Sequence, residues 1–405
     1  MLRSTFSALR DRRYAAFFTG QVLSNTGTWM ERAALSSLVY ALTGHDERWL
    51  AFVAVLPAIP AFGFSMWAGA IVDRVDVRRF IVGTQVALLV LAALLAALAS
   101  AGLVQPWHVA VYTFVASSVF VFDAPARQSF VPRIVDRKDL TNALALSAVT
   151  FNVARLLGGA AFGFVMVSTT WGWPGCFWLN AASFVFPVIA LSRIRENVRA
   201  AVADEHRVEG LLQGVQFAWR TPIIRGAVLV VLLTSLLGFQ VSHLVPVYAE
   251  KVWRVGVAGQ GTLHAYIGLG ALAGGLSVAA FARRVRRGPH VLRTAFLASL
   301  LLALAARSED FTVALWLLAG AGFLLIQTHT CCNALIQSHV PDALRGRVVA
   351  LFTMCVLGAF PVGGLLAGWA AHSWGAPVTT VVSAALLALS VLLMGWGHRE
   401  LREAD

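Results

Sequence analysis

The sequence predicts an all-α membrane protein with twelve transmembrane helices in two pseudo-symmetric six-helix bundles, and three observations predict it. Of the 405 residues, 58% are apolar and only 13% are charged, whereas soluble domains carry about 25% charged residues. Apolar runs of about 18 to 25 residues recur along the chain, the length that a helix needs to cross a bilayer core. Basic residues gather in alternate connections between these runs. The surplus of apolar side chains must therefore face lipid.

The apolar runs are separated by clusters of arginine, glycine or proline, and six fall in each half of the chain. Only helices and closed barrels pair all their backbone groups in lipid, and these runs lack the alternation of barrel strands. The predicted helices centre near Leu23, Phe62, Leu91, Phe114, Ala154, Phe184, Leu236, Leu272, Leu300, Leu318, Val356 and Leu387. Small residues in the eighth predicted helix favour close packing against a neighbour; they are Gly268, Gly270, Gly274 and Gly275.

A polar stretch over residues 193–225 separates the halves, and its segment GLLQGVQFAW has the spacing of an amphipathic helix along the membrane face. We expect an N-terminal bundle over 1–195, a cytoplasmic linker over 196–225 and a C-terminal bundle over 226–405. An offset of 205 residues aligns parts of the two halves: Arg78 with Arg283, Arg79 with Arg284, Gly159 with Gly364 and Gly163 with Gly368. Such a duplication is typical of transporters with a central site.

The basic residues predict the orientation of the chain. Of the 32 Lys and Arg residues, 26 lie in the two tails, the central linker and four short loops that share one side, and four lie on the other side. The positive-inside rule then places both termini in the cytoplasm, as in a multi-pass protein of the bacterial inner membrane. The net charge of +12 is spread over loops rather than gathered in one stripe, so we expect no nucleic-acid partner.

Catalytic and metal signatures are missing from the sequence. The four cysteines lie within or beside apolar runs without zinc spacing, and no HExxH, GxSxG or P-loop occurs. We therefore expect no enzyme, no metal and no cofactor. A membrane-embedded enzyme or a non-transporting receptor remains the alternative class, although a receptor usually carries a soluble sensing domain and none is evident.

Polar residues on the first predicted helix indicate a water-lined cavity. Four of them recur at helical spacing on one face: Gln21, Asn25, Thr28 and Arg32. Glu31 lies on the flank of this face, and ionisable groups within a membrane are costly enough to be functional candidates. We expect Glu31 to carry protons; the alternative is that it only neutralises Arg32 or Arg155.

Other predicted helices also carry polar residues. Asp123 is a second candidate for proton coupling, although a gate-side ion-pair partner is favoured over a substrate ligand. Asp123 and Arg127 close the fourth predicted helix, and Pro125 predicts its end. The remaining candidates for the substrate cavity are Asn152, Arg155, Gln240, His243, Gln327, His329 and Asn333. The thiols near His329 invite a metal, but adjacent cysteines point to different helix faces, which favours a polar lining.

The loop sequence GAIVDRVDVRR, from Gly69 to Arg79, resembles the G-x-x-x-D-R-x-G-R-R motif of the major facilitator superfamily, with Asp76 at the place of the second glycine. Four longer stretches resemble its transmembrane secretion effector branch, which includes siderophore exporters. They are GTWMERAALSSLVYALTG (27–44), FDAPARQSFVPRIV (122–135), LTNALALSAVTFNVARLLGG (140–159) and PDALRGRVVALF (341–352). The resemblance implies alternating access with a gate formed by Gly69, Asp73, Arg74, Arg78 and Arg79.

The same resemblance implies that helices one, four, seven and ten line the cavity. The expected function is proton-coupled export of a small organic molecule, a siderophore or a similar polar metabolite. Multidrug efflux of lipophilic compounds is the alternative substrate class. The expected partners are the small-molecule substrate, protons and membrane lipid, and the chain is expected to act as a monomer.

Overall fold

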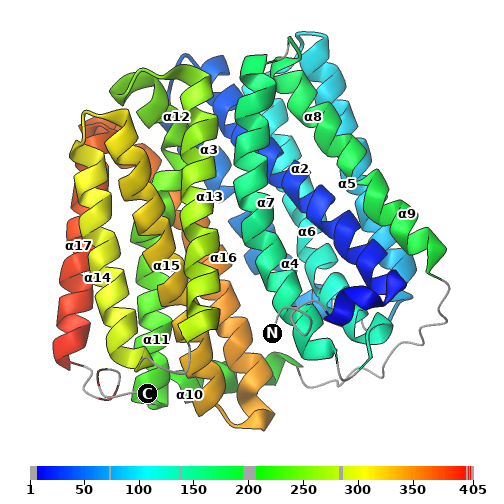
Figure 1. The fold of residues 1–405 in the computed structure, drawn as a ribbon, viewed down its shortest axis with the longest axis vertical. Coiled ribbons are helices and arrows are strands. Elements are labelled where there is room, and N and C mark those ends of the chain that lie inside the picture. Colours follow the sequence, from blue (N-terminus) through cyan, green and yellow to red (C-terminus); the bar gives the residue numbers. More distant parts are fainter. Residues whose placement is uncertain are drawn as a thin grey trace. The chain divides into compact units, whose positions relative to one another are not determined.

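The computed structural model describes residues 7–72, 74–136, 139–168, 170–194, 207–281, 286–397, 400 and 402. Within this described part the chain is helical almost throughout and contains no strand. The helices form two compact units (Figure 1), one of Met1–Leu42 with Ile59–Asp204 and the other of Thr43–Ala58 with Glu205–Asp405. The predicted all-α membrane fold is confirmed.

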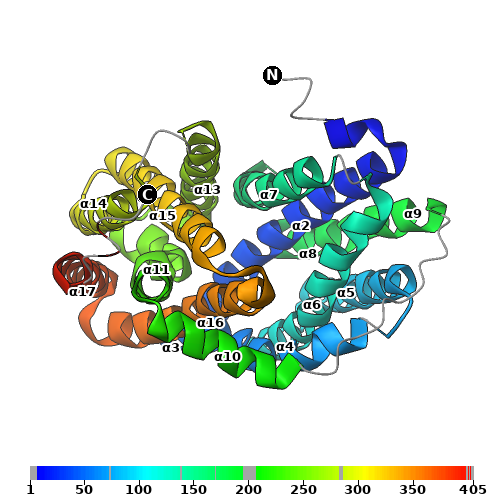
Figure 2. The same cartoon turned by 90° about the horizontal axis from the view of Figure 1, so that it is seen from below.

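The first unit contains seven α-helices in its described residues. They are α2 (Arg12–Leu42), α4 (Ala58–Val72), α5 (Val77–Ser100), α6 (Pro106–Ile134), α7 (Leu140–Ser168), α8 (Gly172–Ser183) and α9 (Val185–Arg193), after a short 3₁₀ turn, η1 (Ser7–Arg10). Figures 1 and 2 show α2 lying between α7 and α8. Asp76 caps α5, because its side chain accepts a hydrogen bond from the backbone N–H of Arg79.

Two glycines allow α2 to approach its neighbours closely. A Cβ atom on Gly158 of α7 would lie 2.5 Å from Cβ of Trp29, and one on Gly27 of α2 would lie 2.4 Å from Oγ of Ser183 on α8. Both separations are shorter than van der Waals contact, so a larger residue would push these helices apart. The glycines therefore bring side chains of α7 and α8 within reach of α2.

The second unit begins with α3 (Glu47–Val55) and continues with α10 (Arg207–Arg220), which lies within the expected linker, and α11 (Pro222–Leu233). Irregular turns follow α11: the π-helix η2 (Thr234–Gly238), the 3₁₀ helix η3 (Phe239–His243), α12 (Val245–Val247) and the π-helix η4 (Tyr248–Val252). The long helices are α13 (Gly256–Phe281), α14 (Arg287–Arg307), α15 (Phe311–His339), α16 (Asp342–Trp374) and α17 (Ala376–Gly397). The predicted amphipathic segment is α10, and Gln213 on it accepts a hydrogen bond of 2.6 Å from Arg347 of α16.

In this unit α15 lies between α13 and α14 (Figures 1 and 2). A Cβ atom on Gly270 would lie 1.8 Å from the carbonyl oxygen of Ala319, and one on Gly274 would lie 2.3 Å from that of Phe323. The predicted close packing of the glycine-rich helix is therefore confirmed at these two positions. Backbone approaches this short need residues without side chains on one of the two helices.

The second predicted span is interrupted, because α3 ends at Val55 and α4 begins at Ala58 after a turn at Leu56 and Pro57. The helix α3 belongs to the second unit and packs on α16, where a Cβ on Gly368 would lie 2.6 Å from Cβ of Ala51. Residues 43–58 lie within the expected bundle over 1–195, but their contacts are with the second unit.

Ten stretches of the described helices are long and apolar enough to cross a membrane. The helices α2 and α13 are not among these ten stretches, but with 31 and 26 residues they are also long enough to cross a bilayer. Counted by length, the described segments then number twelve, as the sequence predicts. One expectation was wrong: α6 does not end at Pro125 but continues to Ile134. Proline removes one backbone donor, and packing against neighbouring helices maintains the helix beyond it.

Candidate functional site

Glu31 lies within α2 with its side chain buried. Only 5% of the residue is accessible, and the hydroxyl group of Tyr112 on α6 donates a hydrogen bond of 2.5 Å to its Oε1 atom. Tyr112 is itself buried. An ionised carboxylate in such a place is costly, whereas a protonated one is not. The pair can therefore exist in two protonation states that differ in their cost to the bundle.

Two guanidinium groups lie against the ring of Trp29 on α2. The Cζ atom of Arg32 is 5.0 Å from the ring centroid and that of Arg155 on α7 is 5.3 Å from it, within the range of cation–π attraction. Arg32 also lies 5.8 Å from the ring of Phe120 on α6, and Phe151 of α7 packs edge-on against Trp29 at 5.2 Å. We call Glu31, Trp29, Arg32, Tyr112 and Arg155 the first-unit cluster.

Asp123 is fully buried among the helices of the first unit. Its Oδ1 atom accepts hydrogen bonds from Thr84 at 2.6 Å and from Gln85 at 3.0 Å, both on α5. Arg127, one turn further along α6, forms an ion pair with Asp123. This network satisfies the buried carboxylate with two donors and one cation, which is the arrangement that burial of a charge requires.

Arg127 extends the network to α2, where it donates hydrogen bonds to the side chains of Gln21 and Asn25. Two other candidates lie apart from this network. Thr28 hydrogen-bonds its own helix, at 3.0 Å from the carbonyl oxygen of Ser24. Asn152 on α7 has a buried Oδ1 atom without a hydrogen-bond partner. On the predicted polar face of α2, Gln21 and Asn25 therefore bond to Arg127, whereas Thr28 bonds to its own helix.

The candidates of the second unit lie on η3 and α15. Nε2 of His329 is 2.9 Å from Oγ1 of Thr234, and Gln327 donates a hydrogen bond of 2.6 Å to Ser277 of α13. Asn333 accepts a hydrogen bond of 3.0 Å from Gln337 on the next turn of α15. These three side chains are therefore used at least partly in bonds within and between the helices of this unit.

Gln240 and His243 lie on the irregular turn η3. The ring of His243 packs 4.3 Å from that of Phe360 on α16, next to Gly364, whose Cβ would lie 2.6 Å from the imidazole Cδ2 atom. Gln240 is buried and its Oε1 atom has no hydrogen-bond partner. A buried amide oxygen of this kind is available to a donor on a ligand or a water molecule.

The predicted gate residues lie at the end of α4 and the start of α5. Gly69 is in the last turns of α4, Arg74 is exposed in the turn that follows, and Asp73 lies outside the described residues. Arg78 donates hydrogen bonds to the carbonyl oxygens of Leu191 at 2.8 Å and Ser192 at 3.3 Å. These bonds fasten the start of α5 to the end of α9. Arg79 is 87% exposed and pairs with Asp76 at 3.4 Å.

The structure also brings together a cluster at the start of α3 that the sequence did not single out. Nδ1 of His372 on α16 lies 3.7 Å from Oδ1 of Asp46 and 3.5 Å from Oε2 of Glu47. Nζ of Lys251 lies 2.5 Å from Oε1 of Glu47, and Arg48 lies 2.8 Å from Asp46. We call these five residues the α3 cluster. All of them except Arg48 line a cavity of about 760 Å³ in the second unit.

The α3 cluster contains the one group of three potential metal ligands among the described residues, Asp46, Glu47 and His372. Arg48 and Lys251 already balance the two carboxylates, so the group needs no metal for charge compensation. The hydrogen bond from the side chain of Arg48 lowers the pKa of Asp46 below its ordinary value of 3.8. Asp46 is also the N-cap of α3, since it accepts a hydrogen bond from the backbone N–H of Arg48.

The sequence matches the transmembrane secretion effector family over residues 3–404, nearly the whole chain. This chain belongs to that family. It is therefore a transporter of the major facilitator superfamily and not an enzyme.

Named relatives of this family member transport several kinds of molecule. It is 27% identical to the multidrug efflux pump Tap of Mycolicibacterium fortuitum over 85% of this chain and 84% of that protein. It is 27% identical to the enterobactin exporter EntS of Escherichia coli O1:K1 over 65% of this chain and 62% of EntS. The staphyloferrin A transporter of Staphylococcus aureus is 23% identical over 89% of both chains.

Solved structures of major facilitator transporters share its fold. A bacterial homologue of the human lysosomal transporter Spinster, in an inward-facing and unoccupied conformation, has a TM-score of 0.74 at 13% identity and covers 97% of this chain and 99% of its own. The nucleoside transporter NupG has a TM-score of 0.69 at 11% identity, covering 94% of this chain and 98% of its own.

Tyr112 and Trp29 were not among the residues expected to form the site. A tyrosine or tryptophan in an apolar run is ordinary in a membrane helix, so neither attracts notice by residue type. The sequence feature that could have pointed to Tyr112 is Glu31 itself, because a buried carboxyl group needs a hydrogen-bond donor from another helix. Only the packing of α2 against α6 and α7 identifies the partner.

Proposed function

We propose that this transporter exports a small polar or anionic organic molecule, a siderophore or a similar metabolite, in exchange for protons by alternating access. It lies in the bacterial inner membrane with both termini in the cytoplasm, and it acts as a monomer. The observation that carries the proposal is the buried Glu31–Tyr112 hydrogen bond beside two arginines that lie against one indole ring.

Glu31 is the proton carrier in this proposal, and Asp123 has a supporting role. Asp123 has Arg127 as a counter-ion and two hydrogen-bond donors, so its interactions are already made within the first unit. Glu31 has a neutral hydroxyl group as its hydrogen-bond partner. Loss and gain of a proton at Glu31 therefore change the charge next to Arg32, which couples proton movement to the binding of an anion.

Anionic cargo is favoured by the arginines of the first-unit cluster. Arginine presents a planar set of donors that fits carboxylates and other oxyanions, and Trp29 offers a flat surface for an apolar part of the same molecule. The unpartnered oxygen of Asn152 adds an acceptor on α7. The relatives that export enterobactin and transport staphyloferrin A support this substrate class.

Multidrug efflux is the second candidate, and the match to the Tap efflux pump over 85% of this chain favours it. Aromatic side chains of the first-unit cluster and of its neighbours Phe120 and Phe151 would accept lipophilic cations. The two candidates differ in the charge of the cargo. Uptake of the cargo into inverted vesicles distinguishes them. Anionic metabolites should compete for this uptake in the first case, and lipophilic cations in the second.

The proton role is tested with Glu31→Gln in proteoliposomes. Glutamine keeps an oxygen that accepts the bond from Tyr112, so we expect a folded protein that still exchanges cargo down its own gradient. We expect it to lose cargo movement driven by a pH gradient. Tyr112→Phe retains the carboxyl group and serves as the structural control. If Glu31→Gln responds to the pH gradient like the unmodified protein, Glu31 has only a structural role.

A further inference from the structure

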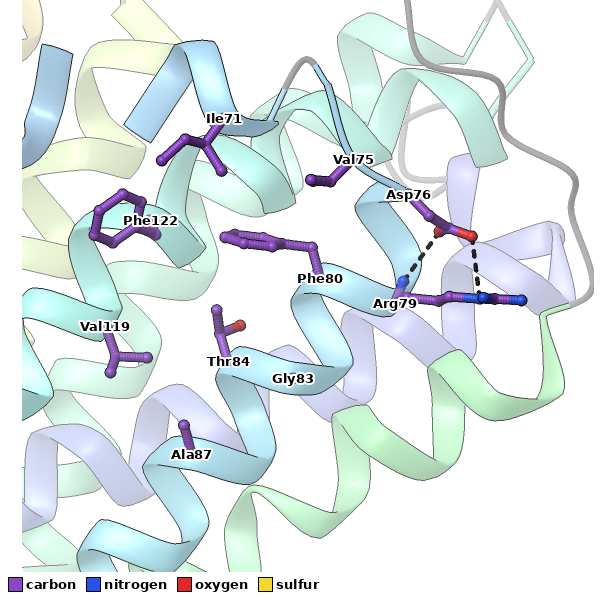
Figure 3. Close-up of a pocket in the computed structure, with 10 residues that line it drawn as sticks. All are labelled: Ile71, Val75, Asp76, Arg79, Phe80, Gly83, Thr84, Ala87, Val119 and Phe122. Atoms are coloured by element: carbon purple, nitrogen blue, oxygen red, sulfur yellow. Dashed lines mark hydrogen bonds and ion pairs between the residues drawn. The ribbon is translucent and has the colours of Figure 1, made fainter. Parts of the chain in front are cut away.

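An apolar groove lies on the first unit, apart from the first-unit cluster. It has a volume of about 690 Å³ and is bounded by the end of α4, the turn after it, α5 and α6. Figure 3 shows Phe80, Thr84 and Ala87 of α5 facing Val119 and Phe122 of α6. The volume falls within the range of about 300 to 1,000 Å³ that is typical of sites for small organic ligands.

The floor of the groove is open at Gly83 of α5. A Cβ atom built on this residue would meet no other atom within 4 Å, although the glycine lies inside a long helix. Glycine within a helix costs about 0.5 to 1 kcal/mol relative to alanine. Close packing within the protein therefore does not explain this glycine, and the missing side chain leaves room for a ligand along this part of α5.

The end of the groove carries charge. Figure 3 shows Asp76 and Arg79 beyond Phe80, and the guanidinium group of Arg79 is 87% exposed. Its pair with Asp76 is exposed, and such pairs are weak, so Arg79 can bind a second anion. Arg74 is exposed in the adjacent turn. The groove thus combines an apolar channel with a basic end.

We propose that this groove binds one anionic phospholipid of the surrounding leaflet. One acyl chain lies along Gly83 between α5 and α6, and the phosphate group binds Arg79 with support from Arg74. Basic residues next to a membrane surface attract anionic lipids, and the apolar walls replace the lipid neighbours of the chain. Thr84 lines the groove and donates a hydrogen bond to Asp123, so the bound chain covers the edge of the buried polar network.

The proposal is tested by native mass spectrometry of the full chain in detergent, titrated with phosphatidylglycerol or with phosphatidylcholine of the same acyl chains. We expect the first phosphatidylglycerol to bind more tightly than phosphatidylcholine. Gly83→Leu fills the floor of the groove and should abolish this preferred site. Arg79→Gln should weaken phosphatidylglycerol about fivefold, the equivalent of about 1 kcal/mol for one basic residue, and leave phosphatidylcholine unchanged.

Both variants have matched controls. Gly63 of α4 is also a helical glycine with nothing within 4 Å of an added Cβ, and it lies outside the groove, so Gly63→Leu should bind lipid normally. Arg79→Gln keeps the α5 cap, because Asp76 accepts from the backbone N–H of that residue; Arg12→Gln removes another exposed arginine. Equal affinities for the two lipids, or unchanged phosphatidylglycerol affinity in either groove variant, would overturn the proposal.

Discussion

At the scale of single residues, the sequence identifies charged groups in the membrane but not their partners. Glu31 and Arg155 stand out because each is an ionisable residue in an apolar run. Their neighbours across helices, Tyr112 and Trp29, become evident only when α6 and α7 pack against α2. Asp123 illustrates the same limit: its pairing with Arg127 follows from helical spacing, whereas its complete burial depends on α5.

A pH prediction follows from Asp46. Because Arg48 lowers its pKa below 3.8 in the folded protein, the carboxylate stabilises the fold above that pH. This contribution is lost as the pH falls through the lower, folded-state pKa. Asp46→Asn retains an N-cap side chain and should have a smaller acid-induced fall in the thermal unfolding temperature than the unmodified protein.

The measurement is thermal unfolding in detergent between about pH 3 and pH 7, the window that brackets the ordinary aspartate pKa. Asp310→Asn, which changes the N-cap of α15, is the matched control and should leave the contribution of Asp46 in place. An identical acid response of Asp46→Asn and the unmodified protein would contradict the prediction.

At the scale of elements, apolar length predicts where helices occur, but not where they break. The runs around Phe62 and Leu236 each predict one continuous span. The structure has a turn at Leu56 and Pro57 in the first and the irregular turns η2 and η3 after α11 in the second. Hydropathy is insensitive to such breaks because the residues remain apolar. In the second break the backbone bonds are local, as from the N–H of Phe239 to the carbonyl oxygen of Thr234.

The contact between α13 and α15 gives a prediction at this scale. Gly270→Ala places a Cβ atom where the carbonyl oxygen of Ala319 lies 1.8 Å away, so the helices must separate. We expect destabilisation of about 1 to 3 kcal/mol, the usual cost of overpacking. Gly83→Ala adds the same atom in open space and should be neutral or stabilising. Thermal unfolding of both variants in detergent tests this, and equal unfolding temperatures would contradict it.

At the scale of the whole molecule, the orientation proposed from loop charge can be measured. All four cysteines are buried, so added cysteines can be labelled over a low background. Glu309→Cys lies in the exposed turn between α14 and α15, and Arg220→Cys lies at the exposed end of α10. In bacterial spheroplasts a membrane-impermeant maleimide should label the former directly and the latter only after permeabilisation. The reverse pattern would place the termini outside.

The place of α3 in the second unit affects how the polypeptide could be divided. The chain passes from one unit to the other between residues 42 and 43, returns between 58 and 59, and passes again between 204 and 205. A fragment starting at residue 205 would therefore lack a helix of its own unit. In that fragment, the surface of α16 around Gly368, which packs against Ala51 in the full chain, would be uncovered. The second unit is complete only when residues 43–58, from the first half of the chain, are present.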